Sequence, residues 1–270
     1  MSFASTLGAC LERIPCPAFP RRARGSARAP AILAIGDSWF FYPMPGGSLI
    51  DGLRNAVADK DHVIHAIGGN GAFLSEFVAG KHRDAVLQSL DEHGPELSAV
   101  FMSCGGNDLS DREALLPILR EECSGARCVE DCFRRRPVAA LLQRVAGYYD
   151  TLLDLILRAA DVRIVVHDYD NALPTGKPFL FGTAAWFKPV FDAVRIPAAL
   201  QSRCVVHILD QFTAALERIV AQHGHRVVLV HSRGTLHPSE WANELHPTAA
   251  GFRKIVDQAW RPVLQRIGIA

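Results

Sequence analysis

Five short apolar runs alternate with longer amphipathic segments along this chain, and this alternation constrains its fold more than any other feature. Each run is rich in Val, Ile or Leu and almost continuously apolar, which is typical of strands buried on both faces. The runs span residues 31–35, 62–67, 97–103, 162–167 and 226–231. Strands that alternate with helices predict a parallel sheet covered by helices on both sides.

The segments between the runs have the apolar spacing of helices. They span residues 48–59, 72–90, 137–160 and 197–222, and a last one spans residues 247–265. In a chain of 270 residues with 49% hydrophobic and 21% charged residues, they are sufficient for one large core. We therefore expect an α/β protein with a three-layer, flavodoxin-like fold and a five-stranded parallel sheet.

Two parts of the chain depart from this pattern. Residues 1–29 hold five arginines and one acidic residue, and we interpret them as a basic leader or arm that precedes a domain over residues 30–270. An irregular insert at about 121–136 holds Cys123, Cys128 and Cys132. Their spacing matches no paired C-x-x-C zinc pattern, and no histidine lies within ten residues, so we expect a local disulfide or buried thiols and no metal site.

The charge of the chain excludes several classes of partner. Lys plus Arg number 29 and Asp plus Glu 28, a net charge of +1 that favours neither nucleic acid nor an anionic membrane. No apolar run approaches the roughly 18 residues of a membrane span, and the N-terminus lacks the apolar segment of a secretory signal. Seven cysteines, an odd number, favour reduced thiols. We therefore expect a cytoplasmic protein that acts on a small molecule.

Residues suited to nucleophilic chemistry follow the predicted strands. Ser38 comes directly after the first strand, in Gly-Asp-Ser-Trp, and His246 precedes the last helix. Gly-Gly-Asn-Gly at 68–71 follows the second strand, and Gly-Gly-Asn-Asp at 105–108 follows the third. The carboxyl ends of parallel strands meet at one edge of a sheet. A hydroxyl that attacks a carbonyl needs a general base and donors for the oxyanion, and these loops offer both.

These blocks resemble the GDSL or SGNH hydrolases, a family of serine esterases and lipases. That family has a Gly-Asp-Ser near the N-terminus, a glycine after the second strand, a Gly-x-Asn-Asp after the third and an Asp-x-x-His-Pro near the C-terminus. The blocks here occur in the same order, and the resemblance covers about residues 30–265. It implies the SGNH hydrolase fold and cleavage of a small-molecule ester through an acyl-enzyme, with no metal and no organic cofactor.

The resemblance also implies a role for each matching residue. Ser38 looks like the nucleophile, whose own N–H faces the oxyanion, and His246 looks like the general base. Asn107 looks like the side-chain donor of the oxyanion hole. Among the glycines after the second strand we choose Gly71 as the backbone donor, because an amphipathic helix follows it, with Gly69 as the runner-up.

One position departs from the family pattern. Asn243 stands three residues before His246, where the family has an aspartate, and Glu244 is the nearest carboxylate in the sequence. An amide oxygen can orient an imidazole, but it cannot stabilise the imidazolium by charge. We therefore expect a Ser38–His246 dyad assisted by Asn243 or by a backbone carbonyl, with Glu244 as a displaced alternative.

Other polar residues near these loops have simpler interpretations. Asp37 and Asp108 are placed to accept hydrogen bonds from turn or helix N-terminal amides, so we predict structural roles for them. The segment after the fourth strand, from His167 to Trp186, is rich in Phe, Pro and Gly. It predicts either a substrate wall or an aromatic cap on the core.

Two other functions compete with ester hydrolysis. Acyl transfer to an alcohol or sugar would use the same site, provided that the acyl-enzyme is shielded from water. A non-catalytic binding domain on the same scaffold is suggested by Asn243. A nucleotide or flavin site is not expected, because no phosphate-binding loop follows the first strand and Asp37 would repel phosphate.

Overall fold

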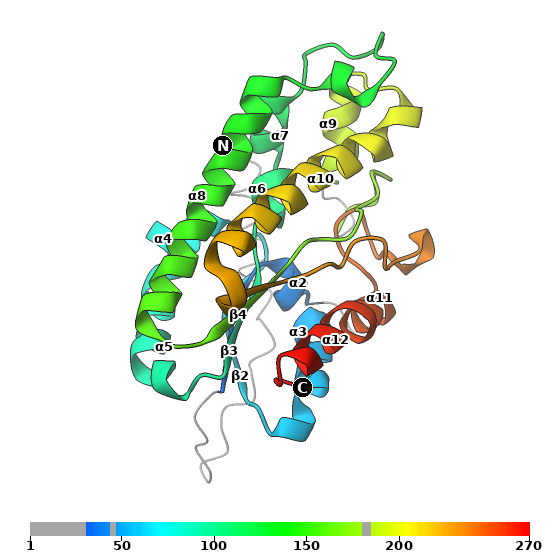
Figure 1. Cartoon of the computed structure of the whole chain (residues 1–270). Helices are drawn as coiled ribbons and strands as arrows, with labels where there is room; N and C mark the ends of the chain where they lie inside the picture. The colour runs from blue at the N-terminus through cyan, green and yellow to red at the C-terminus, as the bar shows by residue number, and fades with distance from the viewer. Residues whose placement is uncertain (1–30, 44–46, 180–184) are drawn as a thin grey trace.

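The computed structural model describes residues 31–43, 47–179 and 185–270 (Figure 1). The predicted basic segment at 1–29 lies outside these residues. All five predicted strands form, and they pair in parallel in the order β2-β1-β3-β4-β5. They are β1 (Ile32–Gly36), β2 (Ile64–Gly68), β3 (Ala99–Ser103), β4 (Arg163–His167) and β5 (Val227–Val230). The predicted flavodoxin-like sheet is confirmed.

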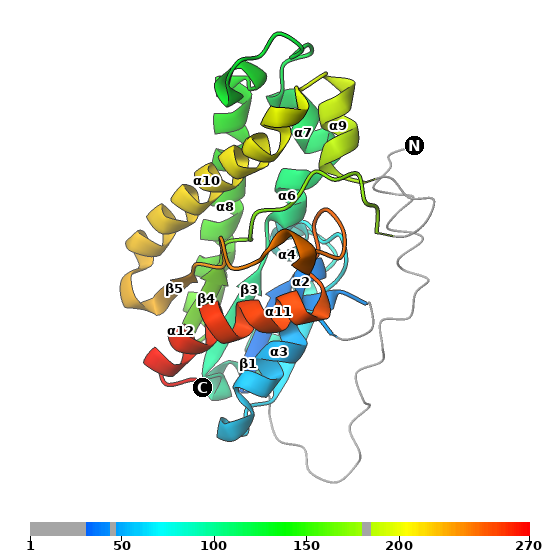
Figure 2. The same ribbon diagram turned by 90° about the vertical axis from the view of Figure 1, so that its right-hand side faces the viewer.

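Helices cover both faces of the sheet, which gives the expected three layers. Figures 1 and 2 show α3, α11 and α12 on one face and α4, α5, α8 and α10 on the other. Within the described ranges, no helix is both long enough and apolar enough to cross a membrane. The bounds are α2 (Ser38–Phe41), α3 (Leu49–Ala56), α4 (Leu74–Ala79), α5 (Arg83–His93), α6 (Gly106–Ser110), α7 (Arg112–Ile118), α8 (Arg135–Ala159), α9 (Phe187–Ala193), α10 (Ala198–His223), α11 (Ala249–Ile255) and α12 (Arg261–Arg266).

The core lies on both sides of the central strands. Every residue of β1 and β3 is buried, whereas the edge strands β2 and β5 are partly exposed. Gly36 of β1 is level with Gly68 of β2 and with Ser103 of β3. The loops that follow these three strands therefore leave the sheet at the same height and at the same edge.

Two predicted helices are interrupted. The segment at 72–90 forms α4 and α5, because Gly80 adopts an extended backbone and a Cβ there would lie 2.7 Å from the Cα of Glu76. The segment at 247–265 forms α11 and α12 with a π-helical segment, Val256–Trp260, between them. The hydrophobic periodicity located these helices, but it carried no signal for the local breaks.

The short helices beyond the carboxyl edge of the sheet, α2 among them, were not predicted. α6, α7 and α9 have five to seven residues each, too few for a helical period to be recognised. α6 begins after Gly105, whose φ of +97° is in the left-handed region. α7 contains Pro117, and a proline within a segment predicts that a helix ends or is broken there.

The predicted insert at 121–136 is a loop closed at its base by an antiparallel bridge between Leu119 and Phe133. It lies at the end of the molecule above α7 and α8 (Figure 1). Cys123 and Cys132 are buried, Cys128 is half-buried, and all three are free thiols. Of the two alternatives for these cysteines, the disulfide is wrong and the free thiols are confirmed.

Candidate active site

Ser38 is the first residue of α2, directly beyond the carboxyl end of β1. Asp37 caps this short helix by accepting a hydrogen bond from the backbone N–H of Trp39 at 3.0 Å. The turn is tight, because a Cβ on Gly36 would lie 2.5 Å from the ring of Phe40. Ser38 is 9% exposed, so its hydroxyl lies in a nearly closed environment.

His246 reaches Ser38 from the loop before α11, more than 200 residues along the chain. Its Nε2 lies 2.7 Å from the Ser38 Oγ. The loop is held by a bridge between Trp241 and Pro247, and the indole N–H of Trp39 donates to the Leu245 carbonyl at 2.9 Å. The turn that holds Ser38 and the loop that holds His246 are therefore joined by a hydrogen bond.

Asn243 orients the imidazole of His246. Its side-chain oxygen lies 3.0 Å from the His246 Nδ1 and also accepts the backbone N–H groups of Leu245 and His246. Its amide nitrogen donates to the Tyr42 hydroxyl at 3.3 Å. These partners leave one orientation for the amide, so Nδ1 carries the proton and Nε2 is free to accept the one on Ser38.

The histidine is buried, and among the described residues no carboxylate is hydrogen-bonded to it. Burial lowers the pKa of His246 to about 3, because desolvation disfavours the imidazolium. The ring of Tyr42 stacks on the imidazole with a centroid separation of 4.5 Å and an angle of 17°. His246 is therefore neutral at pH 7, the state that a general base requires.

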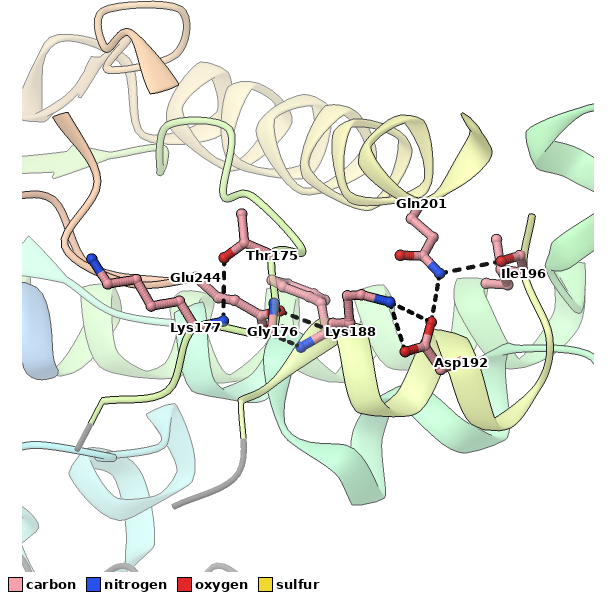
Figure 3. Close-up of polar contacts among 9 residues, drawn as sticks. Thr175, Gly176, Lys177, Lys188, Asp192, Ile196, Gln201 and Glu244 are labelled. Atoms are coloured by element: carbon pink, nitrogen blue, oxygen red, sulfur yellow. Dashed lines mark hydrogen bonds and ion pairs between the residues drawn. The ribbon is translucent and has the colours of Figure 1, made fainter. Parts of the chain in front are cut away.

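Glu244 does not contact the imidazole. Its fully buried carboxylate accepts the backbone N–H groups of Gly176, Trp186, Phe187 and Lys188, and Figure 3 shows it beside Gly176 and Lys188. The displaced-acid alternative for Glu244 is therefore wrong. The side chain that contacts the imidazole of His246 is that of Asn243, three positions earlier in the sequence.

The two predicted oxyanion loops meet beside Ser38. Asn107, in the first turn of α6, donates from its side-chain amide to the Ala72 carbonyl at 2.9 Å, which ties the loops after β2 and β3 together. Gly71 has a φ of +74°, a conformation that favours glycine. The Gly69 N–H donates to the Gly36 carbonyl at 3.2 Å, so this N–H already has an acceptor within the protein. Gly71 is therefore the better candidate of the two.

A small pocket with a cavity volume of about 40 Å³ opens beside Ser38 and Asn107. Its walls are mostly apolar. Gly71, the predicted backbone donor, is not among the residues that line it. The apolar lining residues are Trp39, Leu109, Ala172, Phe187, Ile208, Leu209 and Leu245. A concave apolar pocket beside a serine hydroxyl suits the hydrocarbon part of a small substrate.

Asp37 and Asp108 have the structural roles that were predicted. Asp108 accepts the backbone N–H of Leu74 at 3.0 Å, at the start of α4. Asp37 accepts the Tyr169 hydroxyl at 2.6 Å in addition to its cap bond. Burial raises the pKa of Asp37 to about 7, although these hydrogen bonds oppose the shift.

Sequence reasoning missed Tyr42, which both stacks on His246 and fixes Asn243. Its position offered one signal, since it lies four residues after Ser38 and thus one helical turn away. Trp186, at the end of the predicted aromatic segment, lies with its ring 5.5 Å from that of His246. The substrate-wall interpretation of that segment fits this placement. Among the residues that the structure describes, no group of three His, Cys, Asp or Glu side chains could hold a metal ion.

The tautomer of His246 leads to a prediction about pH. A protonated imidazole cannot accept the Ser38 proton, so we expect kcat/KM to fall as the pH drops through the pKa of His246. Replacing Asn243 with aspartate adds a neighbouring negative charge, which favours the imidazolium and raises that pKa. We expect the acidic limb of the kcat/KM profile to lie below pH 6.5 in the wild type and to move up by at least about one pH unit in Asn243→Asp.

The matched variant Asn243→Leu removes the acceptor without adding charge. It is expected to slow turnover on the order of 10²-fold, because the ring loses its orientation. At neutral pH, Asn243→Asp is expected to raise the rate or leave it unchanged. Identical pH profiles in the wild type and Asn243→Asp would contradict the contact between Asn243 and His246.

The chain is similar to known proteins in sequence pattern and in fold. The model of the GDSL-like Lipase/Acylhydrolase family matches residues 34–254. The structure of an extracellular lipase from Streptomyces rimosus superposes with a TM-score of 0.55 at 18% identity, over 88% of this chain and 100% of that chain. The structure of an active-site mutant of a family two carbohydrate esterase from Clostridium thermocellum superposes with a TM-score of 0.51 at 11% identity, over 91% of this chain and 66% of that chain. No curated protein sequence matches significantly. The structural matches show a shared fold.

Proposed function

Because the chain belongs to the GDSL-like Lipase/Acylhydrolase family of ester hydrolases, we propose that it cleaves a small-molecule carboxylic ester through an acyl-enzyme at Ser38. The observation that carries this proposal is the 2.7 Å contact between the Ser38 Oγ and the His246 Nε2, with the other ring nitrogen held by Asn243. A base in hydrogen-bond reach and an orienter behind it make a serine hydroxyl nucleophilic.

The reaction then follows from the positions of these groups. His246 takes the Ser38 proton as Oγ attacks the ester carbonyl, and the imidazolium returns it to the leaving alkoxide. The negative oxygen of the tetrahedral intermediate is stabilised by the N–H groups of Ser38 and Gly71 and by the amide of Asn107. Water, activated by His246, hydrolyses the acyl-enzyme. The acyl group occupies the apolar pocket beside Ser38.

A direct test combines turnover with labelling. Purified protein is assayed with p-nitrophenyl esters of increasing chain length, and a fluorophosphonate probe is mapped by mass spectrometry. We expect hydrolysis of at least one ester and a single modification at Ser38. Absence of turnover together with labelling of another serine would overturn the proposal. Adding an alcohol to the assay separates acyl transfer, which would yield a new ester, from hydrolysis.

Chelators are expected to leave the activity intact. A serine, a histidine and amide donors suffice for acyl transfer, whereas metal hydrolases need a set of His or carboxylate ligands beside the substrate. Activity is measured after EDTA treatment and after return of zinc. Loss of activity on EDTA treatment and recovery with zinc would contradict the proposed chemistry and implicate the cysteine insert.

A further inference from the structure

The carboxylate of Glu244 joins the histidine loop to two separate stretches of backbone. Oε1 lies 2.7 Å from the Gly176 N–H and 3.2 Å from that of Lys188. Oε2 lies 2.7 Å from the N–H groups of both Trp186 and Phe187. Figure 3 shows the carboxylate between the two stretches. Four charge-assisted hydrogen bonds to one buried carboxylate hold both stretches firmly.

The main chain of Glu244 adds two more contacts, both to the stretch that holds Gly176. The Leu173 N–H donates to the Glu244 carbonyl at 3.2 Å, and the Glu244 N–H donates to the Lys177 carbonyl at 3.4 Å. The nearby ammonium of Lys188 pairs with Asp192 at 2.7 Å instead. Backbone amides therefore hold the Glu244 charge. We call residues 173–179 and 185–188 the wall segment.

The wall segment supplies aromatic side chains to the candidate active site. The ring of Phe179 lies 5.9 Å from that of His246. The ring of Trp186 lies 5.5 Å from the same imidazole, and Phe187 lines the pocket beside Ser38. Of the residues whose amides Glu244 holds, Trp186 and Phe187 carry two of these rings.

The pocket bounded by Phe187 selects against charged groups. Two buried carboxylates, Asp37 and Asp170, line it, and the described residues around it include no Lys, Arg or His. A charged acyl group, whether anionic or cationic, would have to leave water for mostly apolar walls. An uncharged, apolar acyl group fits this lining.

We propose that Glu244 is a positioning residue for substrate selection, which sets the wall segment so that the pocket admits uncharged, apolar acyl groups of limited length. The inference rests on the proposed ester hydrolysis at Ser38. Glu244 acts through the amides of Trp186 and Phe187, and it exchanges no proton with His246. Loosening this attachment lets Phe187 move, and the pocket then discriminates less between acyl chains.

The test compares Glu244→Gln and Glu244→Asp with the wild type. Glutamine replaces one acceptor oxygen with an NH₂ group that faces backbone donors, and aspartate is one methylene too short to reach both stretches. The exposed Glu217 on α10 supplies the matched control, Glu217→Gln. For each protein, kcat and KM are measured with p-nitrophenyl acetate, butyrate and octanoate, together with the pH profile.

We expect the kcat/KM ratio between the best and the poorest ester to fall about 10-fold in both Glu244 variants, mainly through KM, with an unmoved acidic limb. Glu217→Gln is expected to match the wild type. An equal loss for all three esters, a shifted acidic limb, or failure of both Glu244 variants to fold would overturn the inference. A wild-type protein that hydrolyses no ester would instead refute the proposed function.

Discussion

Replacing Ser38 with alanine is expected to lower kcat by about 10⁴-fold to 10⁶-fold, the loss typical of a removed serine nucleophile. Without Oγ, no acyl-enzyme forms, and only the binding pocket and the oxyanion donors remain. His246→Ala is expected to cost about as much, because the hydroxyl and the base act as one unit. The double variant is expected to lose little more than either single variant.

The measurement is steady-state hydrolysis of the best p-nitrophenyl ester, beside fluorophosphonate labelling. Ser202, exposed on α10, provides the control Ser202→Ala, which is expected to keep wild-type rates and labelling. Thermal melts confirm that each variant is folded. Full activity in Ser38→Ala, or additive losses in the double variant, would remove Ser38 from the chemistry.

Replacing Asn107 with alanine is expected to lower kcat by about 10²-fold to 10³-fold, with a small change in KM. A donor to the oxyanion acts on the charge that develops in the transition state, so its loss falls on kcat. One amide hydrogen of Asn107 already goes to the Ala72 carbonyl. The second hydrogen of the same nitrogen is the one we assign to the oxyanion.

The Ala72 contact makes stability an essential second measurement for this variant. Its loss alone would loosen the loop after β2 and lower the melting temperature without a selective effect on kcat. Asn55→Ala, at an exposed position on α3, controls for removal of an amide from a helix. An unchanged kcat in folded Asn107→Ala would show that its side chain takes no part in the transition state.

The fold and the order of the blocks were predictable because they depend on local patterns. Continuous apolar runs specify strands buried on both faces, and helices between them force parallel pairing. Parallel pairing then brings every following loop to one edge of the sheet. Ser38 and the loop of Asn107 could therefore be assigned to one site from spacing alone, and the histidine before α11 could be assigned to it from the family resemblance.

Short helices and helix breaks were less predictable. α6 depends on the left-handed backbone of Gly105, and the break between α4 and α5 depends on the close approach of Gly80 to Glu76. Both are properties of a few torsion angles. Such torsions leave no periodic trace in a sequence, because a single residue determines them.

The sequence by itself determined the sheet and placed Ser38 and Asn107 at its carboxyl edge, because strand periodicity and parallel pairing follow from the chain alone. Only the tertiary structure decided which of Asn243 and Glu244 contacts the imidazole of His246. These neighbours share one loop, and the fold turns Asn243 toward His246 and Glu244 toward the backbone at residues 176 and 186–188. The stacking of Tyr42 on His246 is likewise a tertiary result. Side-chain direction in an irregular loop depends on which distant groups surround it, and adjacent residues in sequence can face opposite ways.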